Sequence, residues 1–293
     1  MSPEPPRQAP LTGPSSPRPR VLFVTDLTYE AKGRRYCDED IHLTARLRED
    51  LDVALCHPLD AASLLETGAF DVAVIRNTGP VLHYQEAWND FRERAAASGT
   101  PVYNQLSGRA DMVGKQYLLD LTSAGYPVIP TVDTPGAADR LPPADTYVIK
   151  PKQGADSIGL RFVPAADLRT SLAGGPAEVL IQPLIDFTYE VSFYYVDRTF
   201  QYALYAPAPD RRWDLRRYDA TPADLAFAQR FIDWNAIDHG IQRVDACRTR
   251  EGALLLVELE DLNPYLSLSL LDAPTRDAFV TALKSSLRAL SGT

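Results

Sequence analysis

The sequence predicts an α/β fold that continues into an α+β fold. Two observations lead to this prediction. Between residues 21 and 110, short apolar segments alternate with segments of helical period, which is typical of βαβ units around a parallel sheet. From residue 111 onwards, strand-like segments follow one another at short intervals, which is typical of antiparallel pairing. We therefore expect an N-terminal domain with a parallel sheet, followed by a larger part with antiparallel sheets.

The first part is read from its apolar segments. Four of them are predicted as buried strands, at 21–24, 52–56, 71–75 and 101–104. Segments of helical period separate them, at 39–50, 60–67 and 84–98. Ligands of parallel sheets gather beyond the carboxyl ends of the strands. The residues expected there to contact a substrate are Asp26, Tyr29, Glu30 and Asn77.

The second part begins with a helix predicted at 111–124 and ends with an amphipathic helix at 274–290. A further helix is expected at 222–239. Residues 196–198 are predicted to form a hairpin turn. The strands of this part are predicted at 147–150, 159–163, 178–182, 189–195, 199–206, 243–247 and 253–260.

Composition narrows the function classes. The 293 residues carry a net charge of −9, which argues against nucleic acid as a partner because phosphate binding needs a basic surface. Three scattered cysteines without a CxxC spacing indicate a reducing compartment, and no apolar run is long enough to span a membrane. We expect a cytoplasmic protein without a membrane partner. Residues 1–20 hold seven of the 24 prolines and are predicted to be a disordered leader.

A strand that ends in Lys150 is followed by a loop with small residues, Gly154, Ser157 and Gly159. Such a loop lets backbone N–H groups approach phosphates, and the lysine adds a fixed positive charge. No Gly-Lys-Ser/Thr follows, so the loop is not a Walker motif. A plain turn with a surface lysine explains this stretch alone equally well. The stretch is therefore a hypothesis for a phosphate site that needs a second element.

Carboxylates on two later strands supply that element. Glu258 and Glu260 share one face of an apolar strand, and the preceding strand carries Arg243 and Asp245 on one face. Two neighbouring carboxylates in an apolar run repel each other and are costly to bury. A divalent cation resolves that cost, and Mg²⁺ prefers hard oxygen ligands. A solvated acidic edge strand is the alternative interpretation.

Together, these two elements resemble the ATP-grasp ligases over most of residues 104–266. The resemblance implies an ATP-grasp fold with an N-terminal α/β domain at 21–110, a central lobe with a glycine-rich lid at 111–188 and a C-terminal lobe with the metal site at 189–293. It implies ATP and two Mg²⁺ ions as cofactors, with Mn²⁺ as a substitute. By resemblance, Arg243 is the catalytic residue that stabilises the acylphosphate and the tetrahedral species. The residues implied to bind nucleotide are Lys115, Lys150, Gly154, Ser157, Gly159, Gln182, Leu184 and Glu190; those implied to bind metal are Asp245, Glu258 and Glu260.

One departure from the family pattern leaves the identity of the metal ligands open by one or two residue positions. The third metal position is usually Asn but is Glu260 here, and Asp261 with Asn263 forms a second acidic pair nearby. Spacing to Pro264 favours Glu258 and Glu260.

The resemblance further implies that a small amino-acid-derived carboxylate is activated as an acylphosphate and joined to an amine, in amino-acid or antibiotic metabolism. Chain length and residues 34–41 make ring closure of the D-cycloserine synthetase type one candidate. Arg217, in the only dense basic cluster, is predicted to clamp a phosphate or carboxylate. A small-molecule kinase and a non-catalytic nucleotide-binding module are the alternatives, and a homodimer is left open.

Overall fold

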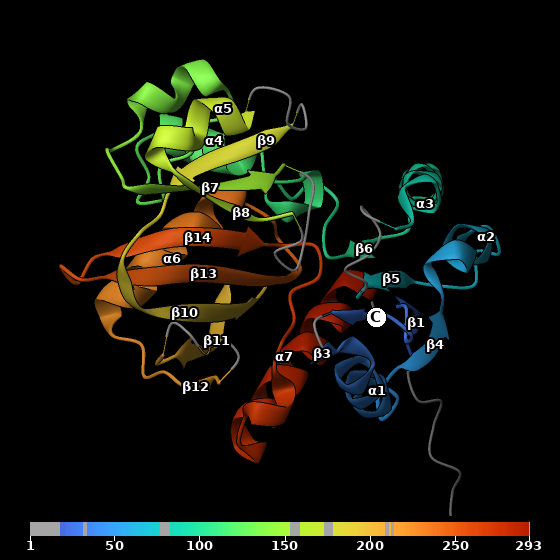
Figure 1. Cartoon of the computed structure of the whole chain (residues 1–293). Helices are drawn as coiled ribbons and strands as arrows, with labels where there is room; N and C mark the ends of the chain where they lie inside the picture. Colours follow the sequence, from blue (N-terminus) through green and yellow to red (C-terminus); the bar gives the residue numbers. More distant parts are fainter. Residues whose placement is uncertain are drawn as a thin grey trace, which may run out of the picture.

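The computed structural model describes residues 18–31, 34–76, 83–152, 159–172, 178–208, 211 and 214–292 (Figure 1). In the N-terminal domain, β1 (Arg20–Val24), β4 (Asp52–Cys56), β5 (Val72–Ile75) and β6 (Val102–Tyr103) form one parallel sheet of order β4-β1-β5-β6. Strands β1, β5 and β6 are buried as the apolar pattern predicted, apart from Arg20 at the start of β1. Strand β4 was also predicted to be buried, but it lies at the edge of the sheet and only its Cys56 is buried. The helices α1 (Tyr36–Leu47), α2 (Ala61–Leu65) and α3 (Gln85–Ser98) connect the strands.

Two features of this domain differ from the sequence prediction. Strand β1 begins at Arg20, inside the segment predicted as leader, because the Arg20 guanidinium and main-chain N–H pair with Asp71. A small antiparallel hairpin, β2 (Glu30–Ala31) with β3 (Arg34–Arg35), precedes α1 and was not predicted. Two-residue strands carry too little periodicity to be recognised in a sequence.

The central sheet is antiparallel and has the order β8-β7-β9. It consists of β7 (Thr146–Pro151), β8 (Arg161–Pro164) and β9 (Val179–Pro183), and α5 (Leu168–Leu172) lies beside it (Figure 1). The single helix predicted at 111–124 is instead a 3₁₀ turn, Asp111–Val113, followed by α4 (Tyr117–Ser123). Gly114 separates the two with a positive φ of 88°, a conformation that ends a helix and favours glycine.

The largest sheet, of order β12-β11-β10-β13-β14, forms the C-terminal lobe. Its members are β10 (Phe187–Val196), β11 (Thr199–Ala206), β12 (Arg216–Arg217), β13 (Ile241–Thr249) and β14 (Leu254–Glu260). The predicted hairpin turn is present, with Asp197 at a left-handed φ of 55°. Helix α6 (Pro222–Asn235) begins with a capping box between Thr221 and Asp224.

The C-terminal helix α7 (Ala273–Ser291) packs against both the N-terminal domain and the C-terminal lobe. Its Phe279 and Leu283 share one apolar cluster with Phe23 and Leu43 of the N-terminal domain and with Tyr202 of β11. The N-terminal domain and the C-terminal lobe are therefore joined by a common core rather than by a linker. No helix in the described ranges is long and apolar enough to cross a membrane.

Candidate functional site

Strands β13 and β14 bring the four predicted charged residues together. They pair antiparallel, with Arg243 opposite Glu260 and Asp245 opposite Glu258. Because cross-strand partners project from the same face of a sheet, all four side chains lie on one surface. Carboxylate oxygens of Asp245, Glu258 and Glu260 lie within 4.8 Å of one another, close enough to hold one cation. The sequence-predicted metal ligands thus form a single cluster, and hard oxygen donors of this kind fit Mg²⁺.

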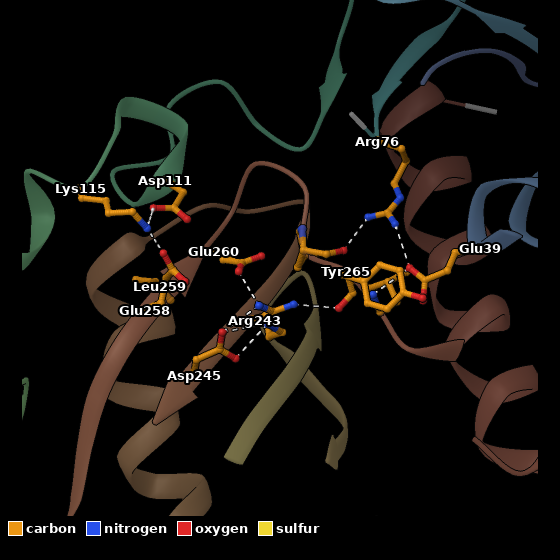
Figure 2. Close-up of polar contacts among 12 residues, drawn as sticks. Glu39, Arg76, Asp111, Lys115, Arg243, Asp245, Glu258, Leu259, Glu260 and Tyr265 are labelled. Carbon is orange, nitrogen blue, oxygen red and sulfur yellow. Dashed lines mark hydrogen bonds and ion pairs between the residues drawn. The ribbon is translucent and has the colours of Figure 1, made fainter. Parts of the chain in front are cut away.

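Arg243 occupies the centre of this cluster (Figure 2). Its Nε donates to Asp245 Oδ1 at 2.9 Å, Nη2 donates to Asp245 Oδ2 at 2.8 Å and also to Glu260, and Nη1 donates to the Tyr265 carbonyl at 2.8 Å. The planar guanidinium therefore donates hydrogen bonds from all three of its nitrogens, which a lysine cannot imitate. Burial acts against the charge of Arg243, but Asp245 and Glu260 outweigh it and raise the pKa of the guanidinium.

Lys115 and Asp111 complete the cluster from a neighbouring segment (Figure 2). Lys115, just before α4, is buried and forms an ion pair with Glu258, and its Nζ lies 3.8 Å from Asp111 Oδ1. Asp111 was not predicted as a site residue, because in the sequence it is only a polar residue inside a helical pattern. Its spacing of four residues from Lys115, which places two side chains on one face of a helix, is the signal that could have found it.

The acidic groups outnumber the cations that pair with them, and their pKa values reflect this. Burial, opposed by Arg243, raises the pKa of Glu260 to about 7. Burial also raises the pKa of Asp111, although Lys115, Lys150 and Arg243 oppose the effect. A desolvated carboxylate at this value is poorly compensated by the protein alone. The cluster therefore gains from an added cation, and a magnesium ion meets that requirement.

The predicted nucleotide residues lie on the elements expected to surround ATP. Lys150 is the last residue but one of β7 and lies within electrostatic range of Asp111. Glu190 lies on β10 opposite Cys247 of β13, which places it on the same sheet face as Asp245. Gly159 has a positive φ of 77°, whereas Gly154 and Ser157 fall outside the described residues.

The predicted adenine hinge follows β9. The Gln182 side chain is buried and donates to Thr131 Oγ1 at 2.7 Å, so it fixes the hinge from behind. The Leu184 side chain is exposed, and its N–H donates to Thr146 O at 2.9 Å. An adenine contact at this hinge would therefore fall on other backbone groups than the Leu184 amide.

At the carboxyl end of β1, Asp26 is buried among hydroxyl groups. Tyr84 Oη donates to Asp26 Oδ2 at 2.6 Å, and Thr28 Oγ1 donates to Asp26 Oδ1 at 2.7 Å. Burial raises the pKa of Asp26, but these hydrogen bonds outweigh it and keep the pKa below the usual value. Tyr29 lies nearby, 5.9 Å from the ring of Tyr36. Asn77 and the side chain of Glu30 lie outside the described residues.

Arg217 is not brought to this cluster. It lies on β12, at the opposite edge of the sheet from β14, and donates to Asp272 Oδ2 at 2.9 Å and to Thr275 Oγ1 at 3.1 Å. Asp272 caps α7, so the described contacts of Arg217 stabilise the start of that helix.

The alternative acidic pair has a different role in this structure. The Asp261 carboxylate is fully buried and accepts from Met112 N at 2.7 Å, Ala110 N at 3.2 Å and Asn235 Nδ2 at 3.0 Å. It is thereby committed to holding the loop before Lys115. Asn263 is buried as well, but its side-chain nitrogen and oxygen have no hydrogen-bond partner among the described residues.

Comparisons with known proteins place this geometry on a known scaffold. No family model and no curated protein sequence matches the chain. Among solved structures, it is similar to D-cycloserine synthetase DcsG, with 22% identity and a TM-score of 0.68 over 92% of this chain and 99% of that one. It is also similar to ATP-grasp ligase PsnB, solved with a phosphomimetic variant of minimal precursor, Mg and ADP, with 17% identity and a TM-score of 0.60 over 90% of this chain and 98% of that one. A third similar structure is D-alanine–D-alanine ligase from Bacillus anthracis, solved with ATP, with 14% identity and a TM-score of 0.63 over 93% of this chain and 97% of that one. The chain has the ATP-grasp fold.

Proposed function

We propose that this chain is an ADP-forming carboxylate–amine ligase that activates a small amino-acid-derived carboxylate as an acylphosphate. The observation that carries the proposal is the cluster of Asp245, Glu258 and Glu260 around Arg243 and Lys115 on an ATP-grasp scaffold. Similar folds whose names state ligase or synthetase activity support it. Two Mg²⁺ ions, or Mn²⁺ in their place, are part of the proposal.

Each residue then has a defined task. Asp245, Glu258 and Glu260 hold magnesium, which neutralises charge on the phosphates when it is bound. Lys115 can exchange its carboxylate partner Glu258 for a phosphate oxygen, and Lys150 adds a second positive charge. Arg243 donates four of its five N–H groups within the described residues and presents the remaining one, on Nη1, to the carboxylate oxygen that gains negative charge as the amine attacks.

Two of the three cysteines, Cys56 and Cys247, do not fit a covalent mechanism. Burial, together with a nearby carboxylate in each case, raises the pKa of Cys56 and of Cys247 to about 12. Both thiols are therefore protonated near neutral pH and are poor nucleophiles. Direct attack of an amine on an acylphosphate requires no thiolate and agrees with this environment.

Substrate contacts are proposed at two places. Asp26, ionised and held by Tyr84 and Thr28, suits an ammonium group of an amino acid. The buried amide of Asn263, free on both polar atoms within the described part of the chain, suits a group with both a donor and an acceptor. The fold similarity to DcsG adds ring closure of the D-cycloserine synthetase type as the first substrate chemistry to try.

The test is an ADP-release screen over amino acids and their derivatives, with Mg²⁺ and with phosphate measured in parallel. A ligase releases orthophosphate only when a carboxylate and a nitrogen nucleophile are both present, in two molecules or, for ring closure, in one. A kinase leaves a stable phosphorylated product, and a non-catalytic module releases no ADP with any pair. Glu258→Gln should abolish release, whereas Glu251→Gln, an exposed glutamate in the turn before β14, should not change it.

A further inference from the structure

A second charged cluster lies in the N-terminal domain, and Tyr265 lies between it and the cluster around Arg243 (Figure 2). It consists of Glu39 and Asp40 on α1 and Arg76 directly after β5. Their side chains are 4%, 0% and 1% exposed, so water does not compensate their charges. The Arg76 Nε donates to Asp40 Oδ1 at 3.1 Å, and Thr25 Oγ1 donates to the other oxygen of Asp40. Buried charges of this kind require fixed partners.

The remaining partners of this cluster are backbone groups of one segment, residues 264–268, which follows β14. Arg76 Nη1 donates to Pro264 O at 2.9 Å. Glu39 accepts from Leu266 N at 2.8 Å and from Leu268 N at 3.0 Å, one on each carboxylate oxygen. Ser267 between them has a left-handed φ of 55°, a conformation that lets neighbouring N–H groups converge on one anion.

The same segment supplies a partner of the proposed catalytic arginine. The carbonyl of Tyr265, between the groups held by Arg76 and Glu39, accepts from Arg243 Nη1 at 2.8 Å (Figure 2). The Tyr265 ring also packs edge-on against Tyr36 of α1, with centroids 4.9 Å apart. A shift of the segment would therefore move the acceptor that orients the Arg243 guanidinium.

We propose that Glu39 and Arg76 are positioning residues for Arg243. They act through the 264–268 segment, by fixing the Tyr265 carbonyl that holds one arm of the guanidinium. The N-terminal domain would thus contribute to the ligation step as well as to substrate binding. The proposal rests on the proposed function for its kinetic part, but its structural part can be measured without any substrate.

The substrate-free measurement is the NMR signal of the Arg243 Nε–Hε group in the full chain, assigned by its loss in Arg243→Lys. Glu39→Gln keeps the side-chain shape but replaces one acceptor oxygen with a donor that meets an N–H. We expect this variant and Arg76→Lys to shift or broaden the Arg243 signal. Glu49→Gln, an exposed glutamate just after the same helix, should leave it unchanged. An unchanged signal in both buried variants would overturn the proposal.

The kinetic measurement separates positioning from general destabilisation. We expect Glu39→Gln to lower kcat about 10- to 100-fold while the Kd for Mg-ATP changes less than twofold, because small misplacements of a catalytic group cost that much. In an Arg243→Lys background the same change should have almost no further effect. An equal loss in both backgrounds, or a parallel loss of ATP affinity, contradicts the proposal.

Two safeguards keep the outcomes distinct. If the buried variants do not fold, Tyr202→Phe tests the same segment, because Tyr202 Oη donates to Leu266 O at 2.7 Å without taking part in the charge cluster. It should shift the Arg243 signal as well, and an unchanged signal would count against the proposal. If the wild-type chain ligates nothing, the proposed function fails, and the NMR result still decides whether Glu39 and Arg76 orient Arg243.

Discussion

Two charged clusters, the Arg243 cluster on β13 and β14 and the buried cluster around Arg76, are built from the same residue types but are compensated differently. Both place one arginine between two carboxylates. In the buried cluster, main-chain N–H groups and a threonine hydroxyl satisfy the surplus negative charge. In the Arg243 cluster, Asp245 and Glu260 are both 18% exposed and lie near two further carboxylates, Glu258 and Asp111. The first cluster is complete as a structural element, whereas the second gains from a ligand.

The difference predicts that removing the arginine lowers the free energy of unfolding much more in the buried cluster than in the other. Arg76→Gln should lower the free energy of unfolding by about 3–5 kcal/mol, because it leaves two buried carboxylates without a counter-charge. Arg243→Gln should cost clearly less, since water reaches Asp245 and Glu260. Chemical denaturation of both variants measures this. Equal losses would show that the two clusters are compensated alike.

The next largest effect is expected on turnover. Arg243→Lys should lower kcat about 10²- to 10³-fold, the usual cost of losing a donor to developing negative charge. A lysine keeps the charge but cannot reach Asp245, Glu260 and the Tyr265 carbonyl together. The thermal midpoint should change little. Arg198→Lys, an exposed pair with Asp233, is the matched control and should retain full turnover.

The Arg243 cluster was predictable from the sequence, whereas the buried cluster was not. Alternation along two strands places Arg243 with Asp245 and Glu258 with Glu260, and antiparallel pairing then joins them. Most elements followed in the same way, because apolar runs and helical periods are local signals. Glu39, Asp40 and Arg76 carry no such signal. The backbone partners of Glu39 and Arg76 lie more than 180 residues away in the 264–268 segment, and backbone acceptors and donors leave no mark in a sequence.

Asp111 and Arg217 illustrate the limits of residue type as evidence. Asp111 stands in a helical pattern four residues before Lys115, a spacing that brings two side chains together on a helix, but nothing in the sequence links it to the charged residues of β13. Arg217 belongs to the densest basic cluster, but strand order places it at the far edge of the sheet. Long-range topology, which the sequence does not display locally, decided both cases.

A smaller effect should appear in the pH dependence of stability. Burial raises the pKa of Glu39 from its ordinary 4.5 to about 7. Between these values the folded state binds a proton that the unfolded state has lost, so stability falls as pH rises from about 4.5 to 7 and then levels off. Glu39→Gln should remove this contribution, at most about 3 kcal/mol. Unfolding titrations of both proteins across this range measure the difference. Parallel curves would mean that Glu39 does not titrate there.

The smallest expected effect is stabilisation by magnesium, and it should involve the Arg243 cluster alone. Mg²⁺ at 100 times its Kd stabilises a folded protein by about 2.7 kcal/mol when it binds only that state. Glu258→Gln and Glu260→Gln should abolish this gain, because each removes one of the oxygens that lie within 4.8 Å of one another. Glu251→Gln and NaCl at equal ionic strength are the controls.

Variants of the buried cluster sharpen the same measurement. Glu39→Gln should retain the full magnesium-induced rise in unfolding free energy. In the wild-type protein both carboxylate oxygens of Glu39 already accept from Leu266 N and Leu268 N, so this carboxylate is not expected to bind the cation. The lower baseline of Glu39→Gln does not matter, because the gain on adding Mg²⁺ is compared within each variant. If Glu39→Gln lost the gain while Glu258→Gln kept it, the cation would bind in the N-terminal domain. The assignment of Asp245, Glu258 and Glu260 as the metal ligands would then be wrong.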